Sequence, residues 1–234
     1  DGALIGVAGE GSSGPTIEQN ASRFEATTGR APAIVNFFWS WWTAADRNNL
    51  QAAPQDVLAS IRRRGAIPFI KWEPWVPGEY RRGRRVTGIT LPQIRTALET
   101  RSGPIYQGVV AFARALRGQG PVMLSFAHEM NSKGDVVYPW AGEPGNFRAV
   151  YKLLREIFDR EGATNVTWVM DFNENEPNWE IYIRGQEAGR VAIDNSSLID
   201  WMAVNGYNFS PGNFSDWRDA EEIFRPFYNR ARHF

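Results

Sequence analysis

The chain has 234 residues, a length that fits one large domain or two small ones. It carries 26 basic and 26 acidic residues, so its formal net charge is zero. A neutral chain lacks the positive surface that nucleic acids and anionic lipids attract, which argues against both as main partners. No apolar run approaches the roughly 18 residues that a membrane-spanning helix needs, so we expect no membrane partner.

Cysteine is absent, and the two histidines, His128 and His233, lie far apart in the sequence. These facts exclude a disulfide framework, a thiolate metal site and most histidine-based zinc sites. We therefore expect neither a metal nor a cofactor. The chain begins at Asp1 rather than at Met, as a mature secreted protein does after its leader is removed, so we expect a secreted, extracellular protein.

Short apolar runs alternate with amphipathic stretches along the chain, which is the pattern of an α/β fold. The predicted strands are residues 4–8, 33–38, 67–71, 122–126, 166–170 and 201–204. The predicted helices are residues 16–28, 54–64, 104–116, 145–160 and 216–232. Because the strand runs are almost wholly apolar, they predict a parallel sheet whose two faces are both covered.

No glycine-rich phosphate motif follows the first predicted strand, which disfavours a nucleotide-binding doubly wound sheet. The other arrangement of parallel strands and helices is a TIM (β/α)8-type barrel. The pattern accounts for about six βα units of such a barrel. No linker, repeat or low-complexity segment divides the chain, so we expect a single domain over residues 1–234.

Polar and aromatic residues cluster directly after the predicted strands, at 39–42, 72–75, 128–131 with 138–140, 171–174 and 205–208. In a (β/α) barrel these positions share one rim, where catalytic groups lie. Aromatic rings cover the apolar faces of sugars, while Asn, Glu and His bind the hydroxyl groups. The rim therefore predicts a site for a neutral polyhydroxylated ligand, with packing between barrel and helices as the alternative role of each Trp. Trp168 and Trp201 lie within strands and are expected to pack.

Glu129 is the strongest catalytic candidate, because it directly follows an apolar strand. Partial desolvation there would raise its pKa and favour the protonated form of a general acid. A buried structural ion pair is the alternative for this carboxyl. Glu73 is either a substrate contact or a supporting carboxylate, whereas Asp171 and Glu174 are expected to be structural or solvated.

At this point the motifs resemble glycoside hydrolase family 26, the β-mannanase and lichenase-like retaining enzymes. The resemblance runs in order through residues 24–30 (FEATTGR), 36–41 (NFFWSW), 72–75 (WEPW), 128–131 (HEMN), 138–142 (YPWAG) and 200–208. It implies a glycosidase domain that hydrolyses β-mannan or mixed-linkage β-glucan, so the expected partner is a polysaccharide or oligosaccharide substrate.

The resemblance also implies roles for individual residues. Glu129 would be the general acid/base, His128 would hydrogen-bond near the sugar, and Tyr207 would hold the nucleophile in place. Trp75 and Trp140 would shape the sugar-binding cleft. The further substrate-binding candidates on the same rim are Trp39, Glu73, Asn131, Tyr138, Asn173 and Asn205.

The family's nucleophile is a Glu at the end of a seventh strand, which the pattern places shortly beyond Phe234. Six βα units leave a barrel open, with unpaired edges on its first and last strands. We therefore expect a further C-terminal segment, a partner chain that closes the barrel, or a loss of catalysis. The sequence also departs from the family at Asn205, where many members have Asp, and in the long segment 132–137.

Three alternatives to a retaining hydrolase stay open. The first is a non-catalytic carbohydrate-binding or assembly protein on the same scaffold. The second is an inverting enzyme with Asp171 or Glu73 as its base, which needs carboxyl groups roughly 6.5–9.5 Å apart. A metal-dependent enzyme or deacetylase is the least supported, because only one His is well placed.

Overall fold

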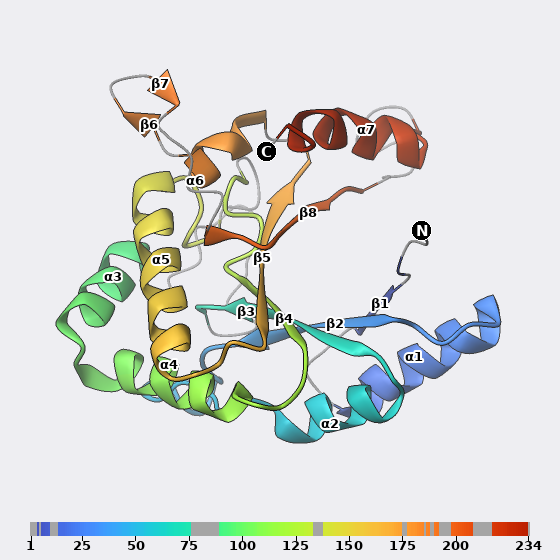
Figure 1. The fold of residues 1–234 in the computed structure, drawn as a ribbon, viewed down its shortest axis with the longest axis horizontal. Coiled ribbons are helices and arrows are strands. Elements are labelled where there is room, and N and C mark those ends of the chain that lie inside the picture. Colours follow the sequence, from blue (N-terminus) through green and yellow to red (C-terminus); the bar gives the residue numbers. More distant parts are fainter. Residues whose placement is uncertain are drawn as a thin grey trace.

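The computed structural model describes residues 4, 6–9, 14–75, 89–132, 138–174, 177–184, 186–187, 190–191, 198–207 and 217–233. Six parallel strands form a curved sheet in the order β1-β2-β3-β4-β5-β8, and helices cover its outer face (Figure 1). Their bounds are Gly6–Gly9 (β1), Ile34–Ser40 (β2), Ile67–Glu73 (β3), Val122–Phe126 (β4), Val166–Asn173 (β5) and Trp201–Asn205 (β8). This open half-barrel confirms the prediction of a partial TIM-type fold.

The bounds of the helices are Gly14–Thr28 (α1), Gln55–Arg63 (α2), Leu91–Thr100 (α3), Gly103–Leu116 (α4), Pro144–Arg160 (α5), Glu180–Arg184 (α6) and Ala220–Ala231 (α7). Helices α1 to α6 lie between strands along the chain, and α7 follows the last strand. A 3-10 turn, Pro177–Trp179, precedes α6, and a small antiparallel pair follows it, Gln186–Glu187 (β6) with Arg190–Val191 (β7). No helix in the described ranges is both long and apolar enough to cross a membrane.

The predicted helix 216–232 starts too early. Residues 217–219 are not helical. The Asp219 side chain accepts a 2.8 Å hydrogen bond from the Glu222 backbone N–H, so Asp219 is the N-cap and α7 begins at the next residue. Helix α3 was not predicted, although Thr90 and Gln93 form a capping box at its start. Neither α6 nor the short strands β6 and β7 were predicted.

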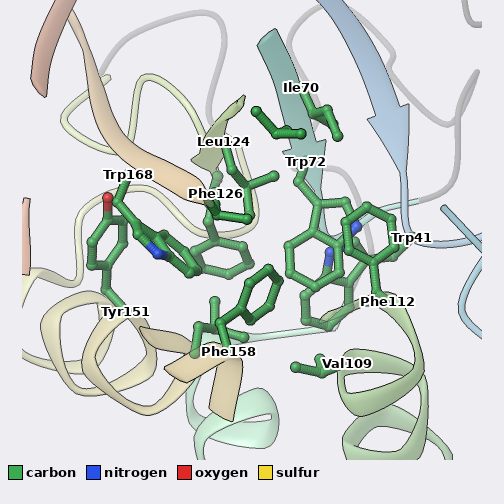
Figure 2. Packing of buried hydrophobic residues seen from close by; sticks show 14 of the residues in the cluster. Trp41, Ile70, Trp72, Val109, Phe112, Leu124, Phe126, Tyr151, Phe158 and Trp168 are labelled. Atoms are coloured by element: carbon green, nitrogen blue, oxygen red, sulfur yellow. The ribbon is translucent and has the colours of Figure 1, made fainter. Parts of the chain in front are cut away.

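The core lies between the sheet and the helices and is rich in aromatic rings (Figure 2). Trp72 of β3 stacks on Phe112 of α4, with ring centroids 4.4 Å apart, and it also contacts Trp41 at 5.0 Å. Trp41, Trp42 and Trp72 were expected on the rim, yet all three are buried in this core. For these three, the packing role is the one that the structure supports.

Trp201 is a correction in the opposite direction. It was expected to pack, but it is 52% exposed on β8, a strand at the edge of the sheet. Within the described residues β8 pairs only with β5, so no neighbouring strand covers this ring. A central strand and an edge strand can have the same apolar sequence pattern, so the sequence did not predict that Trp201 lies on an edge strand.

Five of the six strands end later than predicted, and β2, β3 and β5 do so by two or three residues. Side chains alternate between the two faces of a strand. In β3, Ile70 and Trp72 join the helix-side core, whereas Lys71 and Glu73 line a pocket on the concave side. In β2, Phe38 faces the same pocket, so Trp39 points toward the helix side.

Candidate active site

A pocket of about 310 Å³ opens on the concave side of the sheet, at the carboxyl ends of the strands. It is lined by Phe38, Lys71, Glu73, Trp75, His128, Tyr138, Asn205 and Tyr207. Six of these eight residues are predicted site residues, and they lie at the ends of three strands, β3, β4 and β8, or in the segments that follow them. Glu129 lies beside this pocket, because both Asn205 and Tyr207 face its carboxyl group.

The chain after β4 adopts an unusual backbone that brings Glu129 to this position. Ala127 and Glu129 both have positive φ, at 52° and 50°, a region that costs about 1 kcal/mol or more for residues other than glycine. Neighbouring strands hold this conformation. The Ala127 N–H donates to the carbonyl of Trp72 at 3.0 Å, and the Glu129 N–H donates to the carbonyl of Asp171 at 2.6 Å.

The Glu129 residue is only 6% exposed, and burial is the main reason why its pKa is raised. The negative charge of Asp171 raises the pKa further, whereas the side-chain amides of Asn173 and Asn205, which face the carboxyl group, and the positive charge of Lys71 lower it. The Tyr207 side chain also hydrogen-bonds to the Glu129 carboxyl group. The role that the resemblance implies for Tyr207, holding the nucleophile, stays a prediction. The arrangement suits a carboxyl group that donates a proton in one step and accepts one in the next.

Glu73 and His128 form a second buried polar pair in the pocket. Glu73 accepts hydrogen bonds from Trp75 Nε1 at 2.8 Å and from Ser40 Oγ at 3.3 Å, and burial raises its pKa to about 7. Its Oε1 lies 3.5 Å from His128 Nδ1. Burial, together with Lys71, lowers the pKa of His128 to about 3, so this imidazole is neutral.

A neutral imidazole has one donor and one acceptor nitrogen. When Glu73 is ionised, a proton on His128 Nδ1 faces the carboxylate and leaves Nε2 to accept from the Tyr138 hydroxyl at 3.2 Å. Tyr138 in turn stacks on Trp140, with centroids 4.8 Å apart and planes 5° apart. The pair Glu73 and His128 can thus orient a hydroxyl group on the pocket wall.

Trp140 supports the pocket from behind. It is fully buried, and its indole N–H donates to the His128 carbonyl at 2.8 Å. Trp75 packs edge-on against both Trp140 and Tyr138, at 5.7 and 5.8 Å. Trp75 and Tyr138 are thus aromatic residues of the pocket wall, in addition to Phe38 and Tyr207, and Trp140 packs behind them.

Besides Glu129 and Trp140, three predicted site residues do not line the pocket. Asn131 uses its side-chain amide on the backbone of Asn173, donating to the carbonyl and accepting from the N–H, both at 2.9 Å. Asn173 is turned toward Glu129 instead. Trp39 packs against the helix-side core and donates its indole N–H to the Ala52 carbonyl at 3.1 Å.

Sequence reasoning missed Lys71 and Phe38 as pocket residues. Lys71 forms a 2.8 Å ion pair with Asp171, which is 1% exposed and has the structural role expected of it. The signal for Lys71 was its position inside an apolar strand, since a buried ammonium group requires a partner. Among the residues with described positions, no group of three or more His, Asp and Glu side chains is placed to hold a metal ion.

Comparisons with known proteins connect this geometry to glycosidases. No protein-family model matches the chain. It is 26% identical over 223 residues to Endoglucanase H of Acetivibrio thermocellus. The aligned region covers 92% of this chain and 21% of that protein. The chain therefore spans about a fifth of the length of this curated relative.

The solved structures that match share its fold. The YdhT protein from Bacillus subtilis has a TM-score of 0.67 and 21% identity, covering 98% of this chain and 69% of that one. The Bacillus subtilis mannanase man26 has a TM-score of 0.59 and 19% identity, covering 87% of this chain and 63% of that one. The chain thus has the fold of the glycoside hydrolase family 26 mannanases, and it is a low-identity homologue of Endoglucanase H.

Proposed function

We propose that this chain carries the acid/base centre of a retaining endo-β-glycanase that hydrolyses β-1,4-linked polysaccharide, β-mannan or mixed-linkage β-glucan. The observation that carries the proposal is Glu129, a buried carboxyl of raised pKa beside an aromatic pocket at the carboxyl ends of the strands. The names of the relatives, an endoglucanase and a mannanase, support the substrate class.

In this reaction protonated Glu129 donates its proton to the oxygen of the leaving sugar while a second carboxylate attacks the anomeric carbon. Glu129 is then a carboxylate and takes a proton from the water that releases the glycosyl-enzyme intermediate. Its surroundings fit both steps. Burial favours the protonated form, while Asn173, Asn205 and Lys71 favour the ionised form.

The pocket wall fits a sugar ring. Trp75 and Tyr138 offer aromatic faces, and the Tyr207 hydroxyl and the Asn205 amide offer hydrogen-bonding groups. Neutral His128 fixes the Tyr138 hydroxyl. A neutral glycan is the ligand class proposed, because the carboxyl groups around the pocket outnumber its one ammonium group, Lys71.

The nucleophile is proposed to come from outside the described residues, as the family resemblance implies. The two other carboxyl groups near the pocket are already engaged. Asp171 pairs with Lys71 at 2.8 Å, and Glu73 is held by Trp75 and Ser40. These engagements favour a second candidate function, the binding of glycan without hydrolysis. An extracellular location belongs to both proposals, because polysaccharides of this kind are met outside the cell.

The test is the release of reducing ends from β-mannan and mixed-linkage β-glucan by the full-length natural protein, its Glu129→Gln variant and a Glu156→Gln control. Glu156 lies on α5, with its side chain 54% exposed. We expect Glu129→Gln to lower the rate at least about 100-fold, the contribution of a general acid, while glycan binding persists. Equal rates in the wild type and Glu129→Gln would contradict the acid/base role. Binding without any release from the wild type would support the second candidate.

A further inference from the structure

The Lys71 ammonium group joins three strands of the sheet at the floor of the pocket. Its side chain is 8% exposed, and Nζ lies 2.8 Å from Asp171 Oδ2 on β5. The same nitrogen donates to Asn205 Oδ1 on β8 at 3.1 Å. The Phe38 ring of β2 covers it, with the ring centroid 5.4 Å away. Lys71 is thus held on several sides in one position.

This position fixes which way the Asn205 amide points. An ammonium group only donates hydrogen bonds, so of the two ends of the amide only Oδ1 can face it. The amide nitrogen must then point away from Lys71. It is buried, it is turned toward the Glu129 carboxyl, and it makes no well-aligned hydrogen bond to another described residue.

Resting on the role of Glu129 proposed above, we propose that Lys71 is a positioning residue for this acid/base. It holds the Asn205 side chain with Oδ1 toward β3, so that the amide nitrogen presents its N–H groups to the Glu129 carboxyl. Lys71 thereby acts on Glu129 through Asn205, in addition to neutralising the charge of Asp171.

The reversed amide shows why an orienting group matters. If the Asn205 amide rotated by half a turn, its carbonyl oxygen would face the Glu129 carboxylate, and the two lone-pair oxygens would repel each other. The observed orientation stabilises ionised Glu129, the form that activates water. The other groups that face Glu129 are Asn173 and Asp171 from β5, the Tyr207 hydroxyl after β8, and Ser132, whose Oγ lies 3.4 Å from Glu129 Oε2.

The test is a double-mutant cycle on the 234-residue chain, read by the pKa of Glu129. Glutamate labelled with ¹³C at the side-chain carboxyl is titrated by NMR, and the Glu129 signal is identified as the one that Glu129→Gln removes. In the wild type, Asn205→Ala should raise the pKa of Glu129 by about one unit, because the N–H groups that stabilise the charged form are lost. In Lys71→Met, adding Asn205→Ala should leave that pKa unchanged, because the amide is no longer oriented.

Lys152→Met is the matched control, because Lys152 lies on α5 with its side chain 65% exposed. In that background Asn205→Ala should raise the pKa of Glu129 as it does in the wild type. The same rise in Lys71→Met as in the wild type would overturn the proposal. Should Lys71→Met fail to fold, because Asp171 is left as an unpaired buried charge, the cycle is run in Lys71→Met with Asp171→Asn, which keeps the site neutral.

The titration requires no turnover, so the two proposals are tested separately. If the full-length protein released no reducing ends while this chain showed the Lys71-dependent shift, the hydrolase proposal would fail and the positioning role of Lys71 would stand. If glycan were hydrolysed but Asn205→Ala shifted the pKa of Glu129 equally with and without Lys71, the hydrolase proposal would stand and the positioning role of Lys71 would fail.

Discussion

Lys71 and Asp171 form a 2.8 Å ion pair although their strands, β3 and β5, are separated by β4. Lys71 also reaches Asn205 on β8, a further strand away, at 3.1 Å. In a flat sheet, strands spaced about 4.8 Å apart would put β3 and β8 about 14 Å from each other. The contact therefore depends on the curvature of the half-barrel and on the length of the lysine side chain.

The ionisation of Glu73 predicts a pH dependence of stability. Burial raises its pKa from 4.5 to about 7, so between these values the folded protein keeps a proton that the unfolded chain releases. The free energy of unfolding contributed by this group is therefore greatest below pH 4.5, and it falls by about 3 kcal/mol as the pH rises to 7. Urea unfolding of the wild type and Glu73→Gln over this range measures the difference.

His128 acts with the opposite sign, which is why the comparison with Glu73→Gln is needed. Its pKa is lowered from 6.5 to about 3, so the unfolded chain binds more protons in that range and stability rises with pH. This contribution is present in both proteins and cancels in their difference. Curves that stay parallel from pH 4.5 to 7 would show that Glu73 does not titrate as its burial requires.

Asn131→Ala tests the connection between the Glu129 loop and β5. The substitution removes two hydrogen bonds and leaves the backbone N–H and carbonyl of Asn173 without these partners. We expect the free energy of unfolding to fall by about 1–3 kcal/mol, since unsatisfied buried polar groups are costly. Chemical denaturation measures this loss, and hydrogen exchange of the Asn173 amide should become faster. The exposed Asn48→Ala is the control, with an expected change within about 0.5 kcal/mol.

Gly206→Ala tests the close packing of α7 on the end of β8. A Cβ atom at Gly206 would overlap Ile223 Cγ2 and would lie 2.7 Å from Phe224 Cε1. We expect a loss of about 1–3 kcal/mol in the free energy of unfolding, the usual cost of overpacking. Because Gly206 lies between Asn205 and Tyr207, glycan binding should weaken as well.

Gly145→Ala is the control for this substitution. Gly145 lies in the first turn of α5, and a Cβ atom there would meet no other atom within 4 Å. Alanine is favoured over glycine in helices, so the stability of this variant should be unchanged or slightly higher. If both variants unfolded at the same urea concentration as the wild type, α7 would have to shift easily on β8.

Much of the architecture could be predicted from local patterns. Each of the six large strands corresponds to a predicted apolar run, because parallel strands covered on both faces are nearly continuous in hydrophobicity. For the same reason, the sequence does not predict which side chains point to the helices and which point to the concave side of the sheet. With no alternation to read, Trp39 and Trp72 appeared equivalent to Glu73, although only Glu73 faces the pocket.

The sequence by itself determined the order of strands and helices and the placing of Glu129 directly after β4, since these follow from local hydrophobicity and from the next few residues. The tertiary structure alone decided that Lys71 meets Asp171 and Asn205. Asn205 lies 134 positions along the chain from Lys71. Such a contact is set by the curvature of the whole sheet, so no local pattern encodes it. A lysine in an apolar strand indicates that the ammonium group has a buried partner, but only the tertiary structure shows which residue that partner is.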